Sequence, residues 1–145
     1  RMFERDETIA ALLEDGLMRA GNNPMISSVA KRMSLDHSDS LQYLESLAQS
    51  SEQAPDVIYL DPMFPARQKS AAVKKKFQLL HVLEKPCDEA EEDALIRAAF
   101  AAGSRKVVIK RPVKGGHLAG IKPSYSITGK AVRYDVLVPP STKLQ

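Results

Sequence analysis

Polar side chains come directly after two apolar runs of the sequence. Asp61 and Pro62 follow the run Val57–Leu60, and Lys110 follows Val107–Ile109. In open α/β sheets ligands bind beyond the carboxyl ends of the strands, so a carboxylate placed there can accept hydrogen bonds from a ligand or a reacting group. A simple strand-ending turn explains Asp61 and Pro62 equally well, and position alone leaves both interpretations open.

Three further polar residues lie just past predicted strands. Glu4 ends a strand-like segment at the start of the chain, and Asp39 and Ser40 follow a second short segment at 34–37. Glu4 also suits the start of a helix, and the side-chain oxygens of Asp39 and Ser40 suit the cap of the helix that bears Leu41. All these candidates converge only if the strands that carry them are parallel neighbours.

The elements that must position these residues alternate along the chain. Apolar periodicity predicts helices near 9–21, 24–33, 41–47, 73–80 and 88–102, and short apolar runs predict strands at 1–4, 34–37, 57–60 and 107–109. The run at 57–60 is typical of a parallel strand covered on both faces by helices. The sequence therefore predicts an α/β fold with a mostly parallel sheet.

The last part of the chain has a different pattern. Apolar residues alternate between 132 and 138, after a short run at 125–127, which predicts an antiparallel hairpin that turns at 128–130 and closes the sheet. The loop 113–123 contains three glycines, and we expect it to be the most mobile segment.

Length and composition set broad limits. The 145 residues suffice for one domain or part of one, and 21 basic against 18 acidic residues give a formal net charge of only +3. Cys87 is the only cysteine, which fits a reducing compartment, so we expect the cytoplasm. No apolar stretch reaches the roughly 20 residues of a membrane helix, so we expect no membrane partner. His37, His81 and His117 lack metal-ligand spacing, so we expect no metal.

Four segments, RMFERDE, LDHSDSL, VIYLDPMFPARQKSAAVKKK and KVVIKRP, resemble in order and spacing the RsmJ family of ribosomal RNA methyltransferases. The likeness runs from Arg1 to about Pro139. Its most specific element, DPMFP, is similar to the Asp/Asn-Pro-Pro-aromatic motif of amino-group methyltransferases, with Met63 at the second proline. The resemblance implies a Rossmann-like class I methyltransferase sheet, S-adenosylmethionine as cofactor, and methyl transfer to the exocyclic N2 of a guanosine in 16S ribosomal RNA.

The resemblance also implies a cofactor site. Glu4 and Arg5 would lie beside the cofactor, with Glu4 accepting from the ribose hydroxyls. Asp39 and Ser40 would lie near the adenine, and Asp61 would lie where cofactor and substrate meet.

The catalytic residues implied by the resemblance belong to the DPMFP segment. Asp61 and the carbonyl of Pro62 would accept the hydrogens of the target amine, and Phe64 would stack on the base. A base inside a helix cannot reach such a pocket, so the target must be single-stranded, in a loop or flipped out.

Basic residues follow both the DPMFP segment and the next strand. A solvated helix face is the simpler explanation of an isolated lysine run, but adjacency to the motif favours RNA phosphate contacts, which weaken steeply as salt rises. The expected partner is small-subunit ribosomal RNA, either naked or in the 30S particle, and the sequence leaves the oligomeric state open. The predicted RNA contacts are Arg67, Lys69, Lys74, Lys75, Lys76, Lys110 and Arg111.

The family's glycine-rich loop should precede Arg1, and no segment of the chain replaces it. We therefore expect residues 1–145 to form a single but partial methyltransferase domain that is inactive alone and belongs to a longer enzyme. Two alternatives stay open. One is an amino methyltransferase acting on another nucleobase, which mapping of the methylated nucleotide would reveal. The other is a noncatalytic RNA-binding module, whose RNA binding would ignore both the cofactor and Asp61.

Overall fold

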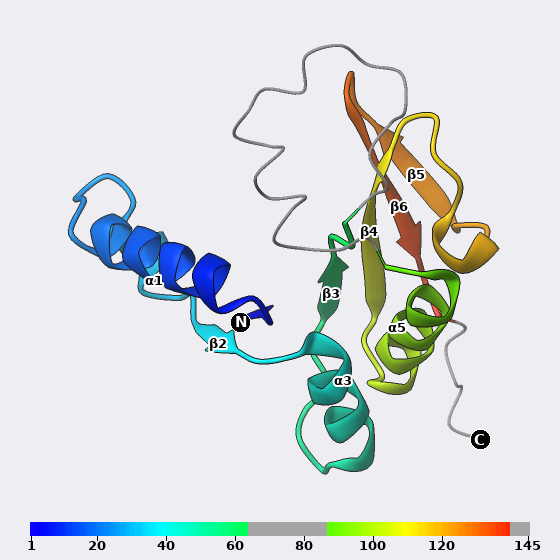
Figure 1. The fold of residues 1–145 in the computed structure, drawn as a ribbon, viewed down its shortest axis with the longest axis horizontal. Helices are drawn as coiled ribbons and strands as arrows, with labels where there is room; N and C mark the ends of the chain where they lie inside the picture. The colour runs from blue at the N-terminus through cyan, green and yellow to red at the C-terminus, as the bar shows by residue number, and fades with distance from the viewer. Residues whose placement is uncertain (64–86, 140–145) are drawn as a thin grey trace. The chain divides into compact units, whose positions relative to one another are not determined.

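The computed structural model describes residues 1–63 and 87–139 (Figure 1). The chain divides into two compact units, Arg1–Tyr43 and Leu44–Gln145. The single domain expected over 1–145 stays a prediction. The helix expected at 73–80 lies outside the described residues.

The first unit is a small layer of two strands and two helices. Strands β1 (Met2–Glu4) and β2 (Leu35–His37) pair in parallel, with Glu4 opposite His37. Helices α1 (Glu7–Gly21) and α2 (Ser27–Ala30) connect the strands. A parallel pair needs such a crossover because its second strand starts at the same end as the first. Both strands and α1 agree with the sequence prediction.

Aromatic and ionic contacts tie the ends of this unit together. The rings of Phe3 and Tyr43 stack with centroids 4.1 Å apart. Arg1 donates from Nε to the Asp36 carboxylate at 2.7 Å, and its guanidinium lies over the Tyr43 ring. The ion pair raises the pKa of Arg1 and lowers the pKa of Asp36, but both side chains are exposed, so water screens the pair.

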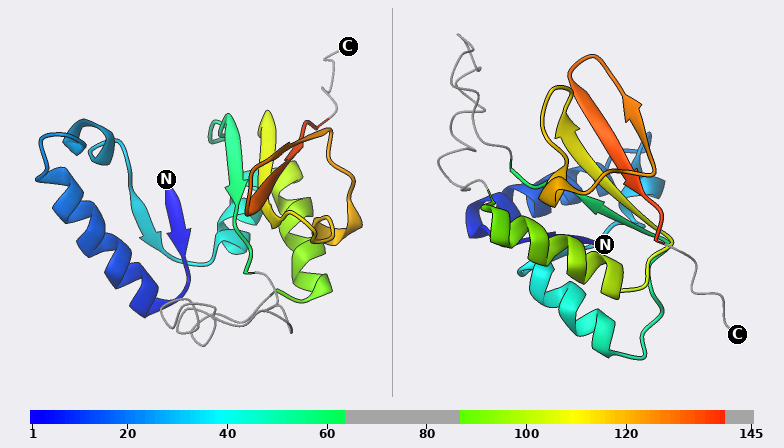
Figure 2. Two further views of the ribbon diagram at one scale, coloured as in Figure 1. Left: turned by 90° about the horizontal axis from the view of Figure 1, so that it is seen from above. Right: turned by 90° about the vertical axis from the view of Figure 1, so that its right-hand side faces the viewer.

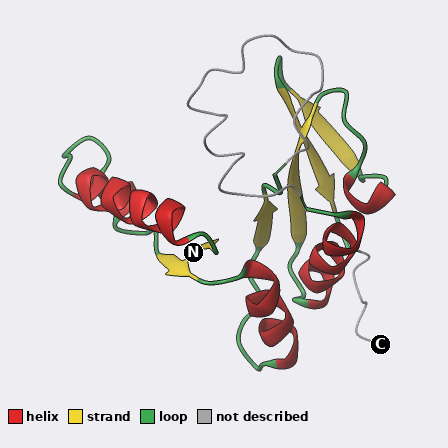
Figure 3. Cartoon of the chain, viewed as in Figure 1, coloured by secondary structure: helices red, strands yellow, loops and turns green. Residues whose placement is uncertain are grey.

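Helix α3 (Ser40–Gln49) leads into the second unit and buries Leu44 and Leu47. The sheet of this unit has the strand order β3-β4-β6-β5. It contains β3 (Val57–Leu60), β4 (Lys106–Pro112), β5 (Tyr125–Thr128) and β6 (Val132–Leu137), shown as arrows in Figure 3. Strands β3 and β4 are parallel, whereas β6 pairs antiparallel with both β4 and β5. The predicted arrangement is confirmed: the strands up to β4 pair in parallel, and the antiparallel pairs belong to the C-terminal hairpin of β5 and β6.

One face of this sheet carries the core. Helix α5 (Glu89–Ala101) runs along that face (Figure 2) and begins with a capping box in which Asp88 and Glu91 satisfy each other's backbone N–H groups. In β3 the residues alternate: Ile58 and Leu60 are buried, whereas Val57 and Tyr59 are 50% and 53% exposed. Within the described residues of the second unit, this alternation is that of a strand covered on one face; because the helix expected at 73–80 lies outside the described residues, the cover predicted for the other face stays a prediction.

The loop after β4 is held by a short 3₁₀ helix, η1 (Leu118–Gly120), that buries Leu118. Ala119 has a positive φ of 48°, which a non-glycine residue rarely adopts. Its backbone N–H donates to the Glu92 carboxylate of α5 at 3.0 Å, and this bond holds the turn against the helix. The greater mobility expected for 113–123 stays a prediction.

Candidate active site

The carboxyl end of β3 lies beside the middle of β4. Leu60 pairs with Ile109 in the parallel ladder, so the next residues, Asp61 and Lys110, are neighbours across the two strands. Lys110 Nζ donates to Asp61 Oδ2 at 2.7 Å. Their side chains are 32% and 43% exposed, respectively, so a ligand can reach the pair from solvent. The hydrogen bond to Asp61 raises the pKa of Lys110, which keeps its ammonium charged at neutral pH.

Two tyrosines flank this ion pair. Tyr59 precedes Asp61 by two residues and so shares its face of β3, and Tyr134 of β6 is the ladder partner of Lys110. The two rings lie with centroids 6.4 Å apart. Partial burial and then the Asp61 carboxylate raise the pKa of Tyr59, against the opposing effect of Lys110, so the phenol stays neutral. The site therefore combines one carboxylate, one ammonium and two phenols.

The rest of the DPMFP segment is only partly described. Pro62 is buried directly after the strand, and its ring fixes the backbone that follows Asp61. Phe64, Arg67 and the predicted lysine contacts Lys69, Lys74, Lys75 and Lys76 lie outside the described residues. The roles assigned to Pro62 and to these residues stay predictions.

The other predicted cofactor residues gather at one end of the β1–β2 pair. Ser38 donates its backbone N–H to the Glu4 carbonyl at 3.0 Å, which joins the two strand ends. Glu4 Oε1 accepts from the backbone N–H of Asp6 at 2.8 Å, and Asp39 Oδ1 accepts from that of Leu41 at 2.7 Å. These are the local roles anticipated for both acids, and each carboxylate carries a second oxygen that a ligand hydroxyl can use.

Arg5 and Ser40 occupy the same end of the first unit. The carbonyl of Arg5 lies 3.3 Å from Nε2 of His37, and Ser40 is the first residue of α3. The structure thus brings the four predicted residues of the first unit to adjacent strand ends, and it brings Asp61 together with Lys110 in the second unit.

Arg111 has a different position from the one expected for a phosphate contact. It is 8% exposed and donates to the Glu92 carboxylate at 3.2 Å and to the Gly116 carbonyl at 2.9 Å. Its neighbour Lys110 faces the opposite side of β4, as successive residues of a strand do. The geometry of Arg111 favours a structural role inside the second unit.

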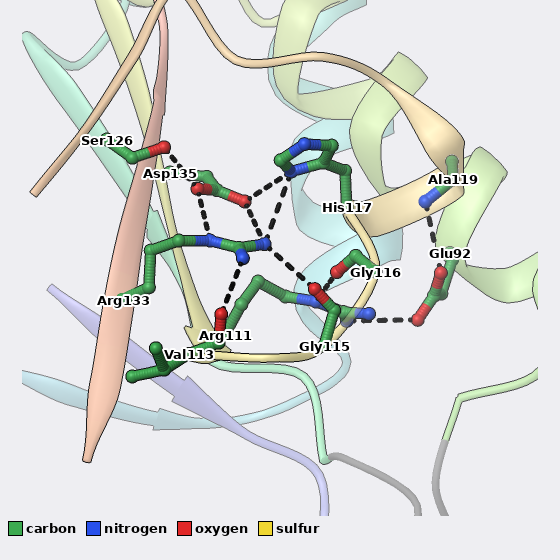
Figure 4. A network of polar contacts seen from close by, with 10 residues as sticks. All are labelled: Glu92, Arg111, Val113, Gly115, Gly116, His117, Ala119, Ser126, Arg133 and Asp135. Atoms are coloured by element: carbon green, nitrogen blue, oxygen red, sulfur yellow. Dashed lines mark hydrogen bonds and ion pairs between the residues drawn. The ribbon is translucent and has the colours of Figure 1, made fainter. Parts of the chain in front are cut away.

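The most densely bonded polar group of the described residues was not among the residues expected from the sequence (Figure 4). Asp135 is 2% exposed and accepts from Arg133 Nε at 2.8 Å, from Arg133 Nη2 at 2.9 Å and from Ser126 Oγ at 2.6 Å. His117 Nδ1 lies 2.8 Å from Asp135 Oδ2, the oxygen that also accepts from Arg133 Nη2. Burial alone would raise the pKa of Asp135, but these bonds lower it to about 2.

This network holds the loop after β4 onto the hairpin. Arg133 donates to the carbonyls of Val113 and Gly115, at 3.0 and 3.1 Å. A signal was present in the sequence, because Arg133 and Asp135 alternate with the apolar residues of β6 and so share one face of the strand. What the pattern did not show is that this face is covered.

Within residues 1–63 and 87–139, no group of three or more histidine, cysteine or acidic side chains is placed to hold a metal ion. Over the same ranges, every helix is too short or too polar to cross a membrane.

The strand ends and the acids placed on them define the class of protein. A carboxylate past the end of a parallel strand, with helices connecting the strands, is the arrangement of ligand-binding α/β proteins. Within that class, the family model described as "Putative SAM-dependent methyltransferase" matches residues 1–139. The chain belongs to this family of S-adenosylmethionine-dependent methyltransferases.

Individual relatives support the same family. A protein of Pseudomonas aeruginosa (strain UCBPP-PA14) named "Ribosomal RNA small subunit methyltransferase J" is 46% identical over 135 residues, which are 93% of this chain and 50% of that protein. One of the same name from Neisseria meningitidis serogroup C (strain FAM18) is 42% identical over 141 residues, 97% of this chain and 55% of that protein. These matches confirm the resemblance to the RsmJ family.

A solved structure agrees with the fold. The crystal structure of a SAM-dependent methyltransferase from Neisseria gonorrhoeae superimposes with a TM-score of 0.73 at 34% identity, over 96% of this chain and 52% of that one. The fold is therefore the Rossmann-like methyltransferase fold expected from the sequence. The chain spans about half the length of the curated relatives and of the solved structure that it matches.

Proposed function

We propose that this chain contributes the substrate site and part of the cofactor site of a methyltransferase that modifies the N2 amine of a guanosine in small-subunit ribosomal RNA. The position of Asp61 supports the proposal most directly. Its carboxylate lies past the end of β3, in the DPMFP segment, where the proposed reaction needs an acceptor for the hydrogens of the amine. The names of the relatives support ribosomal RNA as the substrate, and the guanine N2 position follows from the resemblance of the motif.

The acids of the first unit fit the proposed cofactor. S-adenosylmethionine supplies an activated methyl group on its sulfonium. Its ribose hydroxyls and its adenine amine are hydrogen-bond donors. Glu4 and Asp39, with Arg5 and Ser40 beside them, place carboxylate oxygens at the ends of β1 and β2, where such donors can be accepted. We assign the ribose to Glu4 and the adenine to Asp39 and Ser40.

Asp61 would prepare the amine for transfer. The lone pair of a guanine amine is delocalised into the ring, so the reaction needs an acceptor that turns the amine and favours the positive charge developing on nitrogen. Asp61 and the Pro62 carbonyl are the proposed acceptors. When bound, the cofactor would supply the methyl group and leave as S-adenosylhomocysteine, and Asp61 or water would take the one proton that the methylated nitrogen loses.

The RNA must present an unstacked guanosine. We propose that Phe64 stacks on the base and that the basic residues from Arg67 to Lys76 bind phosphates of small-subunit RNA, naked or in the 30S particle. Because its substrate is part of the ribosome, we place the protein in the cytoplasm.

The test measures transfer of a labelled methyl group to small-subunit ribosomal RNA and to 30S particles, followed by mapping of the modified nucleotide. The assay compares this chain with a version extended at its N-terminus to the length of the relatives. We expect the extended protein to modify a guanosine N2 and the 145-residue chain to be inactive. Methylation of an adenine would overturn the substrate assignment, and turnover by the short chain would contradict its expected inactivity.

A pair of matched variants tests the site itself. Asp61→Asn keeps the shape of the side chain but removes its charge. We expect turnover of the extended protein to fall at least about 100-fold, because the carboxylate both orients the amine and stabilises the charge developing on its nitrogen. Asp56→Asn is the control, because Asp56 precedes the same strand and its pair with Arg105 is exposed to solvent. RNA binding that ignores both S-adenosylhomocysteine and Asp61, without turnover, would favour a noncatalytic module.

A further inference from the structure

Lys110 bonds the Asp61 carboxylate, a contact that a residue binding RNA phosphates would not require. We propose that Lys110 is a positioning residue for the methyl transfer: by pairing with Asp61 Oδ2 it holds the carboxylate in place and directs its other oxygen to the target amine. This inference rests on the proposed function and assigns Lys110 to Asp61 rather than to the RNA backbone.

The register of the sheet makes this pairing a property of the fold. The parallel ladder runs from Val57 opposite Lys106 to Leu60 opposite Ile109, so Asp61 and Lys110 are the next residues in line. Strand β4 continues past this point and pairs with β6, which holds the backbone of Lys110 opposite Tyr134. Pairing with β6 therefore holds the backbone of Lys110 in place, and only the lysine side chain adjusts to reach the Asp61 carboxylate.

The contact has the geometry of a strong, charge-assisted bond. Lys110 Nζ and Asp61 Oδ2 are 2.7 Å apart, at the short end of the range for such pairs. The lysine side chain is about two-thirds buried, so water screens the interaction less than it screens a surface pair. The bond uses Oδ2, and the carboxylate has Oδ1 to offer to a donor from the substrate.

The charges around the pair balance within the described residues. The groups that act on Lys110 there are Asp61, which contributes most, and the phenols of Tyr59 and Tyr134. Tyr59 is kept neutral by its raised pKa, so the single carboxylate faces a single ammonium.

The positioning role and the phosphate role predict different kinetics. A phosphate contact contributes to RNA binding, so its loss raises KM for RNA and reduces the slope of log affinity against log salt by about 1. A group that acts through Asp61 matters when the amine reacts, so its loss lowers kcat and leaves KM and the salt slope nearly unchanged.

The experiment uses the extended protein with the variants Lys110→Met, Lys110→Arg, Asp61→Asn and the double variant. For Lys110→Met we expect kcat to fall about 10- to 100-fold, as for a misplaced reacting group, with KM for RNA within about twofold. Lys110→Arg should recover most of the rate, and Lys110→Met should cost nothing further in the Asp61→Asn background. Lys106→Met is the control, because Lys106 is exposed on the same strand.

The outcomes separate this inference from the proposed function. Raised KM and a reduced salt slope for Lys110→Met, at unchanged kcat, would overturn the positioning role in favour of a phosphate contact. Full activity of Asp61→Asn would overturn the proposed role of Asp61 itself. If the unmodified protein shows no turnover, NMR titration of the Lys110 ammonium still tests the pair: its pKa should fall in Asp61→Asn, and an unchanged pKa would refute the pairing.

Discussion

The buried carboxylate of Asp135 offers a sharp test of how the second unit is held together. Replacing it by asparagine keeps its size and removes its charge. Arg133 would then lie in the same position, largely buried, without a counter-ion. We expect Asp135→Asn to be strongly destabilising, because a buried charge that loses its partner keeps its full desolvation cost.

The magnitude follows from two independent estimates. The pKa of Asp135 falls from 3.8 to about 2, which corresponds to about 2 kcal/mol of stability at neutral pH, since each factor of ten in proton affinity is about 1.4 kcal/mol. Removing one partner of a buried ion pair typically costs about 3–5 kcal/mol. Arg133 retains its bonds to the carbonyls of Val113 and Gly115, which reduces this cost, so we expect about 3 kcal/mol.

The assay is urea unfolding followed by circular dichroism, for the unmodified protein and for Asp135→Asn, at several pH values. Because the folded pKa lies below the unfolded one, the contribution of Asp135 is complete above about pH 5 and is lost as pH falls from about 4 to about 2. The difference in unfolding free energy between the two proteins should therefore shrink over that interval.

A surface aspartate supplies the control. Asp93 forms an exposed pair with Arg97 one helical turn away in α5, at 2.6 Å, and Asp93→Asn should cost less than about 0.5 kcal/mol. The reasoning fails if Asp135→Asn costs no more than this control, or if its cost stays the same at pH 2 and pH 7.

Two other substitutions test the attachment of α5. Glu92→Gln should destabilise the protein by about 2–3 kcal/mol in urea, because Glu92 accepts from both the buried Arg111 and the backbone of Ala119, and a change below about 0.5 kcal/mol would contradict this. Asp88→Ala removes the N-cap of α5 and should cost about 1 kcal/mol, seen as a lower Tm, whereas an unchanged Tm would show that the cap is dispensable.

Local patterns in the sequence predicted most of the secondary structure. The run Val57–Leu60, the alternation of β6 and the acids that begin α5 correspond to elements of the structure, with shifts of a few residues at their ends. Such signals are local, because capping and periodicity depend on residues within one or two turns of each other. Asp61 was found in the same way, from its place directly after an apolar run.

Contacts between distant segments were not predictable from these patterns. Lys110 reaches Asp61 across 49 residues of sequence, and the charges of Arg133 and Asp135 look like solvent-facing residues of a hairpin until the loop that covers them is known. Arg111, a basic residue next to a lysine, was expected to meet RNA and instead bonds Glu92 inside the unit.

The sequence by itself determined which segments form helices and strands, where their acids lie, and that the chain resembles a methyltransferase. Only the tertiary structure decided which of the charged residues meet. The physical reason is that periodicity assigns a residue to a face of its own strand, whereas its partner depends on the order and register of the strands, which are set by packing over the whole unit.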